Sequence, residues 1–123
     1  MDCTILIVED HDTVRASLRD WLASAFPASR LVDTNTGEEA VRLAAEFHPT
    51  IVLMDIGLPH MSGIEAARQI VEAAPQTKVI MLTIYEAADY QQAARAAGAV
   101  AFIPKRKMYL DLLPMLQQLA LTV

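Results

Sequence analysis

Residues 51–59 hold the feature that most constrains the fold: four apolar residues run directly into a carboxylate, and glycine and proline follow it. The sequence there is Ile-Val-Leu-Met-Asp-Ile-Gly-Leu-Pro. A short apolar run that ends at turn residues predicts a strand buried on both faces, as in parallel sheets covered by helices on either side. Asp55 is therefore expected at the carboxyl end of a central strand, at the sheet edge where ligands bind in open α/β folds.

The rest of the chain alternates such apolar runs with segments of helical period, which is typical of repeated β-α units and a parallel sheet. We expect one domain over residues 1–123. Its fold class is predicted to be α/β, a flavodoxin-like doubly wound sandwich with a five-stranded parallel sheet in the order 2-1-3-4-5 and five helices. This order places the most polar run, 30–33, at an edge. The expected strands cover residues 4–8, 30–33, 51–54, 79–83 and 100–103.

Capping signals mark the starts of the first three predicted helices. Asp12 is the expected N-cap of the first, because its carboxylate can accept hydrogen bonds from backbone N–H groups. Thr36 with Glu39, and Ser62 with Glu65, have the spacing of a capping box. In that motif the acid three residues on returns a hydrogen bond to the cap. Helices are therefore expected to begin at these positions.

The last two predicted helices have weaker signals. The segment 87–97 is rich in alanine and short of large apolar groups, so its helix should be weakly anchored, with Gly98 as its stop. Pro114 leaves two alternatives for the final helix. A start at Asp111 places this proline in the first turn, where its missing N–H is no loss. A start near Lys107 would kink the helix, so we favour Asp111.

Composition and charge argue against several classes of protein. Hydrophobic residues make up 54% of the chain, yet no apolar run approaches the ~20 residues of a membrane helix. Met1-Asp2 lacks the positive start of a signal peptide, and the single Cys3 can form no internal disulfide, so a cytoplasmic protein is expected. The formal net charge of −5 argues against direct nucleic-acid binding by this domain. The basic run 105–107 is expected to be a solvated loop.

Polar side chains gather at the carboxyl edge of the predicted sheet. Glu9 and Asp10 follow the first strand, Asp55 follows the third, Thr83 ends the fourth, and Lys105 comes just after the fifth. Two like charges ~4 Å apart repel by ~4 kcal/mol at an effective dielectric of ~20. Either some pKa values rise or a cation lies among the acids, and hard oxygen ligands favour Mg²⁺. The alternative is that the acids are separate helix caps with no shared site.

This set of groups suits phosphoryl transfer to a carboxylate. The carboxylate is the nucleophile, a metal ion neutralises the phosphoryl oxygens, and a lysine and a hydroxyl take the remaining oxygens. Simpler alternatives exist for each residue alone: Thr83 as a capping hydroxyl, Lys105 as a solvated charge and Phe102 as plain core. Their joint placement with Asp55 favours a functional site.

The chain resembles the receiver domain of two-component response regulators over essentially its whole length. Each matching motif alone is a weak signal, but their order and separations match together. The residues around Lys105 further resemble the NarL/LuxR-like subfamily, whose output is a C-terminal helix-turn-helix domain; this chain would then be the receiver only, stand-alone or a fragment. The motifs are Ile7-Val8-Glu9-Asp10-His11, Met54-Asp55-Ile56-Gly57-Leu58-Pro59, Met61-Ser62-Gly63, Leu82-Thr83, Ala97-Gly98-Ala99 through Lys105, and, for the subfamily, Asp10-His11 with Val14-Arg15.

The resemblance implies that Asp55 is the phosphoacceptor for a phosphohistidine on a sensor histidine kinase. Mg²⁺ would be held by Asp10, Asp55 and the backbone carbonyl of Gly57, with Glu9 acting mainly through a bound water. The domain would be a signalling module rather than an enzyme. It would catalyse only its own phosphorylation and dephosphorylation, and would control transcription through an output domain.

A conformational switch is implied as well. Thr83 would move toward the acyl phosphate, Lys105 would pair with the phosphoryl group, and Phe102 would follow Thr83 inward, so that phosphorylation shifts the population between two conformers. Three positions depart from the family pattern: Glu9 stands where Asp is commoner, Phe102 has no hydroxyl, and Arg106 follows Lys105 where many receivers carry a proline. We hypothesise a phosphorylation-dependent homodimer that forms through the last two helices and the strand between them.

Three histidines and one tyrosine are harder to assign. His11, His48 and His60 lack metal-ligand spacing and are expected to be solvated or capping. Tyr85, two positions after Thr83, either shades the site and changes the phosphoryl lifetime or is an exposed loop aromatic.

Three other functions suit the same fold class. A hydrolase or phosphatase would need a base or second nucleophile beside Asp55, and none is predicted there. A flavin-binding electron carrier would need a loop rich in Ser, Thr and Gly after the first strand, but the acidic segment 9–12 would repel a phosphate. A degenerate receiver used only for protein contacts would lack the site residues, all of which are present.

Overall fold

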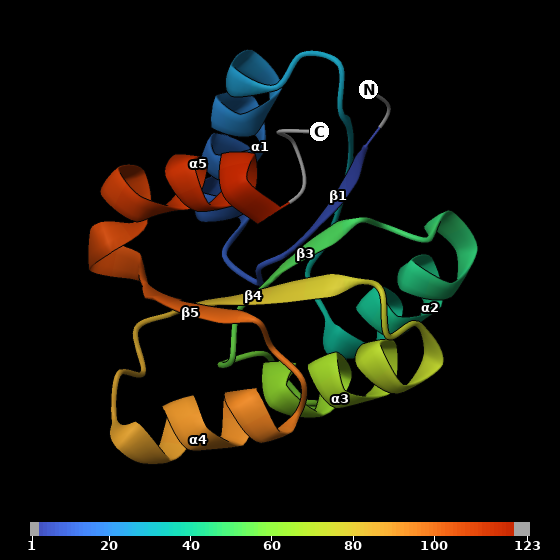
Figure 1. The fold of residues 1–123 in the computed structure, drawn as a ribbon, viewed down its shortest axis with the longest axis vertical. Helices are drawn as coiled ribbons and strands as arrows, with labels where there is room; N and C mark the ends of the chain where they lie inside the picture. The colour runs from blue at the N-terminus through green and yellow to red at the C-terminus, as the bar shows by residue number, and fades with distance from the viewer. Residues whose placement is uncertain (1–2, 120–123) are drawn as a thin grey trace.

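The computed structural model describes residues 3–119 and contains a five-stranded sheet in the predicted order, β2-β1-β3-β4-β5. Every neighbouring pair is parallel, and Figure 1 shows the twisted sheet between two layers of helices. Strand β2 is one residue longer than predicted, and β5 includes Pro104 as its last residue. The strands are β1 (Thr4–Val8), β2 (Arg30–Thr34), β3 (Ile51–Met54), β4 (Lys78–Thr83) and β5 (Ala101–Pro104).

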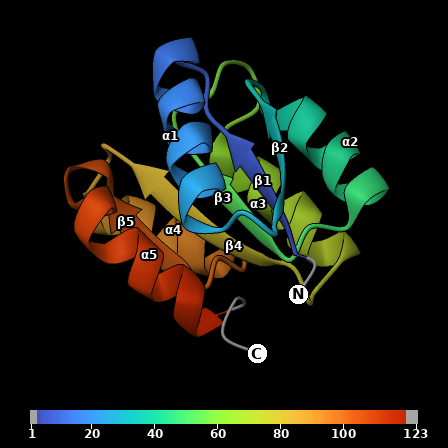
Figure 2. The ribbon, with the colours of Figure 1, turned by 90° about the horizontal axis from the view of Figure 1, so that it is seen from above.

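Helices cover both faces of the sheet, which confirms the doubly wound sandwich. Figures 1 and 2 show α1 and α5 on one face and α2, α3 and α4 on the other. The buried apolar side chains form one cluster on each face. The helices are α1 (Asp12–Ala25), α2 (Gly37–Phe47), α3 (Gly63–Ala73), α4 (Ala88–Ala96) and α5 (Met108–Leu119), with a 3-10 turn η1 (Lys105–Lys107) before α5.

Strand β3 is buried on both faces, as its apolar run predicts. Ile51 and Leu53 belong to the cluster under α1 and α5, whereas Val52 and Met54 belong to the cluster under α2, α3 and α4. Strand β2 is only half buried along most of its length, which agrees with its polar sequence and edge position. Because β3 is the middle strand, the residue that follows it, Asp55, lies at the centre of the carboxyl edge.

Helix α1 begins one residue earlier than predicted. Its N-cap is His11, not Asp12, and no side chain accepts a hydrogen bond at this cap. Asp12 is the first helical residue, and its Oδ1 accepts a hydrogen bond from Arg15 Nη2 at 2.8 Å. The prediction of Asp12 as N-cap is wrong, because the carboxylate pairs with a charged side chain one turn on. An acid in the first turn still interacts favourably with the helix dipole.

The two predicted capping boxes are half formed. The backbone N–H of Glu39 donates to Thr36 Oγ1, and that of Glu65 donates to Ser62 Oγ, both at 3.2 Å. The returning bonds are replaced, because both glutamate carboxylates pair with arginines one turn further along their helices. The hydrogen bond from Arg68 to Glu65 lowers the pKa of that carboxyl to about 2. A charged partner at i+3 has thus replaced the neutral backbone N–H as the partner of the acid.

Helix α5 begins at Met108, so the favoured start at Asp111 is wrong and the alternative start near Lys107 is closer. Pro114 consequently lies in the helix interior. The cause is packing: Met108, Leu112 and Leu116 follow one another at four-residue spacing and are all buried against the sheet. Burying Met108 keeps the first turn helical despite the proline. Pro114 itself is exposed, as is Leu110, whose carbonyl loses the N–H that it would otherwise accept.

Helix α4 is the most weakly anchored, as predicted. Within it only Ala94 is buried, and no side chain caps its start. Gly98 follows with φ of +105°, a left-handed conformation that suits glycine and ends the helix as expected. Across residues 3–119 there is no helix with the length and apolar character needed to cross a membrane.

Candidate functional site

The carboxyl edge of the sheet contains a cleft of about 310 Å³. It lies where β1 and β3 end side by side, since Val8 and Met54 are register partners and the next residues form the loops. Lys105 reaches it from the turn that follows β5. Parallel strands present their carboxyl ends at one edge, so residues distant in sequence line one cleft. The lining residues are Asp10, His11, Val14, Asp55, Gly57, Ile84, Tyr85 and Lys105.

Asp55 lies at the floor of this edge and is only 6% exposed. Its backbone N–H donates to the carbonyl of Val8 at 3.1 Å, which extends the ladder between β1 and β3 by one bond. Oδ1 accepts a hydrogen bond from the N–H of Gly57 at 3.2 Å, and Oδ2 accepts one from Lys105 Nζ at 3.1 Å. Both carboxylate oxygens are therefore held from within the protein.

Lys105 joins Asp55 to a second buried acid. Its Nζ donates to Glu9 Oε1 at 2.6 Å, closer than its contact with Asp55. Burial by itself would lower the pKa of the Lys105 ammonium, but the hydrogen bonds and charges of Glu9 and Asp55 outweigh that effect and raise it. The lysine thus stays charged through neutral pH. Its long, unbranched side chain is what lets it span two carboxylates.

Asp10 differs from its neighbour Glu9 in having a buried oxygen, Oδ1, that accepts no hydrogen bond within residues 3–119, although His11 Nδ1 lies 3.4 Å from it. A buried carboxylate oxygen without a partner is costly. Oxygen donors are what a hard cation such as Mg²⁺ prefers, so the Asp10 oxygen, in the same cleft as Asp55 and Gly57, suits such an ion. Glu9 and Asp10 also form a potential metal-binding group with His11.

His11, expected to be solvated or capping, is the N-cap residue of α1, and its side chain also lies beside the two acids. Its Nδ1 lies 3.4 Å from Asp10 Oδ1 and 3.6 Å from Glu9 Oε2, while its side chain is largely exposed. In the sequence, its position directly after Glu9 and Asp10 is the signal that could have placed it beside the site. His48 and His60 are exposed and both adopt positive φ. His48 is the C-cap of α2, which agrees with a capping role.

Thr83 and Phe102 lie near the site but outside the cleft. Thr83 is fully buried, and its Oγ1 accepts a hydrogen bond from the N–H of Tyr85 at 3.0 Å. Within the described residues its hydroxyl forms no hydrogen bond with Asp55. Phe102 is partly buried against the cluster under α2, α3 and α4, and it lines a separate small pocket beside α4. The structure therefore brings together Glu9, Asp55 and Lys105 by direct contact, and leaves these two residues apart from them.

Tyr85 covers part of the cleft above Gly57. A Cβ added to Gly57 would lie only 2.7 Å from Tyr85 Cε2, so the absence of a side chain at residue 57 leaves room for the ring. The ring is 39% exposed and packs against Tyr90 at 5.1 Å between centroids. Of the two alternatives for Tyr85, its position in the cleft favours the one in which it shades the site.

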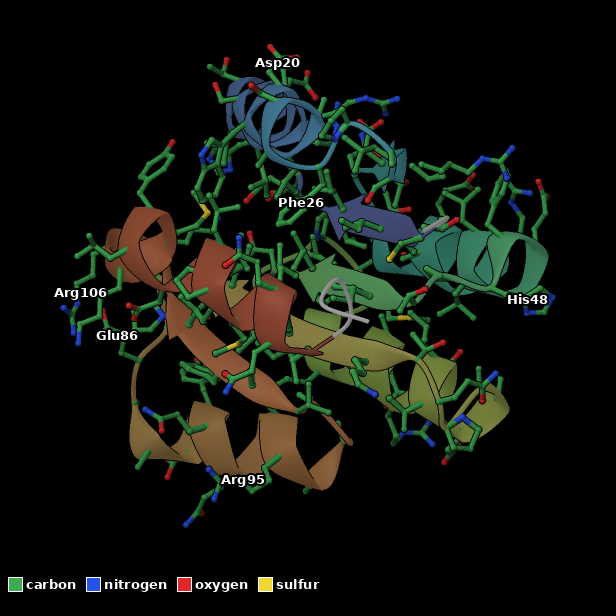
Figure 3. All side chains as sticks on the ribbon, turned by 45° about the horizontal axis from the view of Figure 1, so that its top comes forward. Asp20, Phe26, His48, Glu86, Arg95 and Arg106 are labelled. Carbon is green, nitrogen blue, oxygen red and sulfur yellow. The ribbon has the colours of Figure 1, made fainter. Side chains whose placement is uncertain are left out.

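The basic run 105–107 forms the 3-10 turn η1 rather than an irregular loop, while Arg106 and Lys107 are exposed, as a solvated segment should be. Arg106 donates to both carboxylate oxygens of Glu86, with Nη2 to Oε1 at 2.9 Å and Nε to Oε2 at 3.0 Å. Figure 3 shows these two side chains meeting between the loop after β4 and the turn after β5. The hydrogen bond from Arg106 lowers the pKa of Glu86. A bidentate pair therefore ties together the two loops that follow Thr83 and Pro104.

Comparison with known proteins places this site in a wider context. Residues 5–117 match the response regulator receiver domain family. Among curated relatives, the response regulator GacA of Pseudomonas aeruginosa is 33% identical over 101 residues, covering 82% of this chain and 47% of GacA. The transcriptional regulatory protein LiaR of Bacillus subtilis is 34% identical, covering 82% and 48% respectively. The chain thus spans about half the length of the curated relatives it matches.

Two solved structures are similar over nearly the whole chain. A LuxR-family two-component response regulator from Aurantimonas sp. is 29% identical with a TM-score of 0.87, covering 96% of this chain and 84% of that one. The response regulator domain of Thermotoga maritima CheB is 31% identical with a TM-score of 0.84, covering 97% and 96%.

Proposed function

Because the chain belongs to the receiver domain family of two-component response regulators, we propose that Asp55 is the residue that accepts the phosphoryl group. The observation that carries this proposal is the contact of 3.1 Å between Lys105 Nζ and Asp55 Oδ2 in the cleft at the sheet edge. It places a fixed positive charge beside the carboxylate that follows the central strand. A carboxylate held this way is available for attack on phosphorus.

The donor is a phosphohistidine on a sensor histidine kinase. An Asp55 carboxylate oxygen forms the new bond to phosphorus as the bond from phosphorus to the histidine nitrogen breaks, and the released imidazole takes up a proton. Lys105 then pairs with a phosphoryl oxygen in place of Asp55 Oδ2. Hydrolysis of the acyl phosphate by water regenerates the carboxylate, so the domain itself limits how long it stays phosphorylated.

Asp10, Asp55 and the backbone carbonyl of Gly57 would hold Mg²⁺, and Glu9 would act through a bound water. The unpartnered, buried oxygen of Asp10 supports this role. When bound, the ion supplies positive charge that neutralises the phosphoryl oxygens. Both carboxylate oxygens of Glu9 already accept hydrogen bonds, from Lys105 Nζ and from the N–H of His11, and both oxygens of Asp55 accept them as well. Within residues 3–119, Asp10 is the acid of the three with a buried oxygen that accepts no hydrogen bond, so it is the first candidate for direct ligation.

Thr83 and Phe102 carry the switch. In the unphosphorylated protein the Thr83 hydroxyl accepts the N–H of Tyr85. A phosphoryl group on Asp55 offers that hydroxyl an anionic acceptor, and charge-assisted hydrogen bonds are the stronger kind. Phe102, which is only partly buried beside α4, moves inward as Thr83 moves. Phosphorylation thereby shifts the population toward a conformer in which the surface of α4 and β5 is altered.

The output is transcription regulation through a helix-turn-helix domain outside this chain. The support is that relatives named as transcriptional regulatory proteins are about twice as long as the matched region. Phosphorylation would favour a homodimer through α4, β5 and α5. Light scattering with and without beryllofluoride tests this, and an unchanged mass would remove the dimer from the proposal.

The central experiment is incubation with acetyl phosphate and Mg²⁺, followed by intact mass measurement. The wild-type protein should gain the mass of one phosphoryl group, and Asp55→Ala should gain none. Asp20→Ala is a matched control, because Asp20 is an exposed acid on α1 that does not line the cleft, and Figure 3 shows it at the outer surface of the molecule. Equal labelling of wild type and Asp55→Ala would overturn the proposal. Continuous turnover of a small phosphate ester would instead favour a phosphatase.

A further inference from the structure

Glu9 is held by the protein at every polar group it has. Its N–H donates to the carbonyl of Thr34 at 3.1 Å, which anchors the loop after β1 to the end of β2. Its carboxylate accepts from Lys105 Nζ at 2.6 Å and from the N–H of His11 at 3.0 Å. Its backbone carbonyl accepts from Arg15 Nη1 at 2.9 Å. Two of these contacts come from side chains: Lys105 already has a role in the proposed site, and Arg15 has none.

The Glu9 carbonyl matters because it lies in the same peptide unit as the N–H of Asp10. A peptide unit is planar, so fixing the carbonyl oxygen of Glu9 also fixes the direction in which the chain enters Asp10. Asp10 has the opposite character from Glu9, since its buried Oδ1 accepts no hydrogen bond from residues 3–119. The backbone is thus held tightly one residue before a carboxylate whose inner oxygen accepts no hydrogen bond in the described part of the chain and has His11 Nδ1 nearby, at 3.4 Å.

Arg15 is built into its place by three separate elements. Besides the Glu9 carbonyl, its guanidinium donates from Nη2 to Asp12 Oδ1 at 2.8 Å and from Nε to Asp33 Oδ2 at 3.0 Å. The side chain is only 18% exposed although it is charged. It therefore links the loop after β1, the first turn of α1 and the end of β2. The planar fork of arginine directs three separate nitrogens at these three acceptors, whereas a lysine would offer all its donors from one nitrogen.

We propose that Arg15 is a positioning residue for the cation site, acting through the Glu9 carbonyl to hold the loop in which Asp10 presents its free oxygen. This inference rests on the proposed function, in which Asp10 holds Mg²⁺. Groups that orient metal ligands typically change metal affinity by about 10- to 100-fold when they are removed. Without Arg15 the loop would have to become ordered when Mg²⁺ binds, and this ordering would weaken binding. In the wild-type protein the loop is already ordered by folding.

Arg19 provides a matched control one turn further along α1. Its guanidinium also pairs with Asp33, on the other carboxylate oxygen. Within the described residues it forms no hydrogen bond with Glu9, and it is more exposed than Arg15. Replacing Arg15 or Arg19 with glutamine removes the same charge from the same helix and one partner from the same aspartate. Only the first replacement also removes the contacts with the Glu9 carbonyl and with Asp12, and of these two only the Glu9 carbonyl belongs to the peptide unit that leads into Asp10.

The experiment measures the Mg²⁺ dissociation constant by isothermal titration calorimetry for the wild-type protein, Arg15→Gln, Arg15→Lys and Arg19→Gln. Arg15→Gln should weaken Mg²⁺ binding by at least about 10-fold, Arg19→Gln by less than about 2-fold, and Arg15→Lys by an intermediate factor, because the lysine ammonium keeps the charge but reaches fewer of the three acceptors than the guanidinium does. If Arg15→Gln does not fold, Arg15→Lys against Arg19→Gln decides the same question. Urea unfolding in Mg²⁺-free buffer reports any general loss of stability separately.

Two results would overturn the inference: Mg²⁺ affinity unchanged in both Arg15 variants, or the same loss in Arg19→Gln as in Arg15→Gln. The second would mean that charge or pairing with Asp33, not the Glu9 carbonyl, is responsible. Failure of the proposed function is distinguishable, because the wild-type protein itself would then take up no phosphoryl group on Asp55. If only this inference is wrong, the wild-type protein is still phosphorylated on Asp55, but the Arg15 and Arg19 variants do not differ in Mg²⁺ affinity.

Discussion

Gly63 lies directly against the backbone of Asp55: a Cβ at residue 63 would be 1.9 Å from the Asp55 carbonyl oxygen and 2.7 Å from its carbonyl carbon. The first turn of α3 is thereby pressed against the chain as it leaves β3. The N–H of Gly63 also donates to the carbonyl of Ile56 at 3.0 Å. The close approach fixes the path of the loop that carries Asp55, and glycine is the residue that permits it.

Gly63→Ala is therefore expected to destabilise the protein by at least about 2 kcal/mol, because backbone atoms rather than a flexible side chain must move. Gly37→Ala is the matched control: Gly37 is also the first residue of a helix after a hydroxyl cap, but its added Cβ would be 3.0 Å from the nearest atom. Urea unfolding of both variants measures the difference. Equal losses would show that the contact with Asp55 has no special weight.

Lys105→Met should lower the free energy of unfolding at pH 7 by roughly 3 kcal/mol in Mg²⁺-free buffer, because it leaves two buried carboxylates without their shared partner. The pKa of Lys105 is raised above its ordinary value of 10.5, by Glu9 and Asp55 against the opposing effect of burial. A raised folded-state pKa gives stability that is fully present below the unfolded value and is lost as pH rises through the folded one. The difference between wild type and Lys105→Met should thus stay constant from pH 7 to about 10 and shrink at higher pH. A difference that already shrinks between pH 7 and 9 would contradict this account.

Mg²⁺ should stabilise the folded protein, since the free Asp10 oxygen and Asp55 come together only in the folded chain. At a concentration 100 times the dissociation constant the gain is about 2.7 kcal/mol. Asp10→Ala should lose this increment, whereas Asp20→Ala, which changes an exposed acid on α1, should keep it. Thermal unfolding with Mg²⁺ and with EDTA measures the increment. An equal Mg²⁺ effect in Asp10→Ala would rule out Asp10 as a ligand.

Tyr85→Ala should shorten the lifetime of phosphorylated Asp55 several-fold, because the ring limits the approach of water to the cleft. Tyr90→Ala is the control: it removes the neighbouring ring, which does not line the cleft. Loss of the phosphoryl group followed by intact mass gives the rates. An unchanged lifetime in Tyr85→Ala would return Tyr85 to the role of an exposed loop aromatic.

Gly57 and Tyr85 should also be energetically coupled. Gly57→Ala must displace the Tyr85 ring. This ring is the mobile end of a half-exposed side chain, so the cost to stability should stay below about 1 kcal/mol and should vanish when Tyr85 is alanine. A double-mutant cycle by urea unfolding measures this coupling. If Gly57→Ala lowers the free energy of unfolding just as much in the Tyr85→Ala background, contact with the Tyr85 ring is not the cause of that loss.

Pro114→Ala should stabilise the protein by about 1–3 kcal/mol, because a proline in a helix interior lacks the N–H for the carbonyl four residues earlier. Pro114 is exposed, so little packing is lost. Gln117→Ala, an exposed change in the same helix, should have little effect. Chemical denaturation monitored by circular dichroism compares the two. A loss of stability in Pro114→Ala would mean that the proline serves packing or chain entropy instead.

The architecture was largely predictable from the sequence. The apolar runs define which strands are buried on both faces, and the polar run at Arg30 defines an edge. Because strand ends of a parallel sheet meet at one edge, this pattern also brings Glu9, Asp55 and Lys105 together before any coordinates are known. Helix starts were less predictable. Asp12 and Asp111 are good local caps, but Asp12 pairs instead with Arg15 three residues on, and Met108 is buried one turn before Leu112. Both spacings are present in the sequence, but only the packed structure decides that they outweigh the caps.

The chain alone therefore determined the layer order, the acidic edge and the lysine that faces it, since periodicity and strand polarity are properties of consecutive residues. Only the tertiary structure decided which atoms touch. It put the Arg15 guanidinium on the Glu9 carbonyl, the Tyr85 ring over Gly57 and the helix of Gly63 against Asp55. Those contacts depend on where backbone carbonyls point and on how separate elements pack, and no spacing of residue types records either.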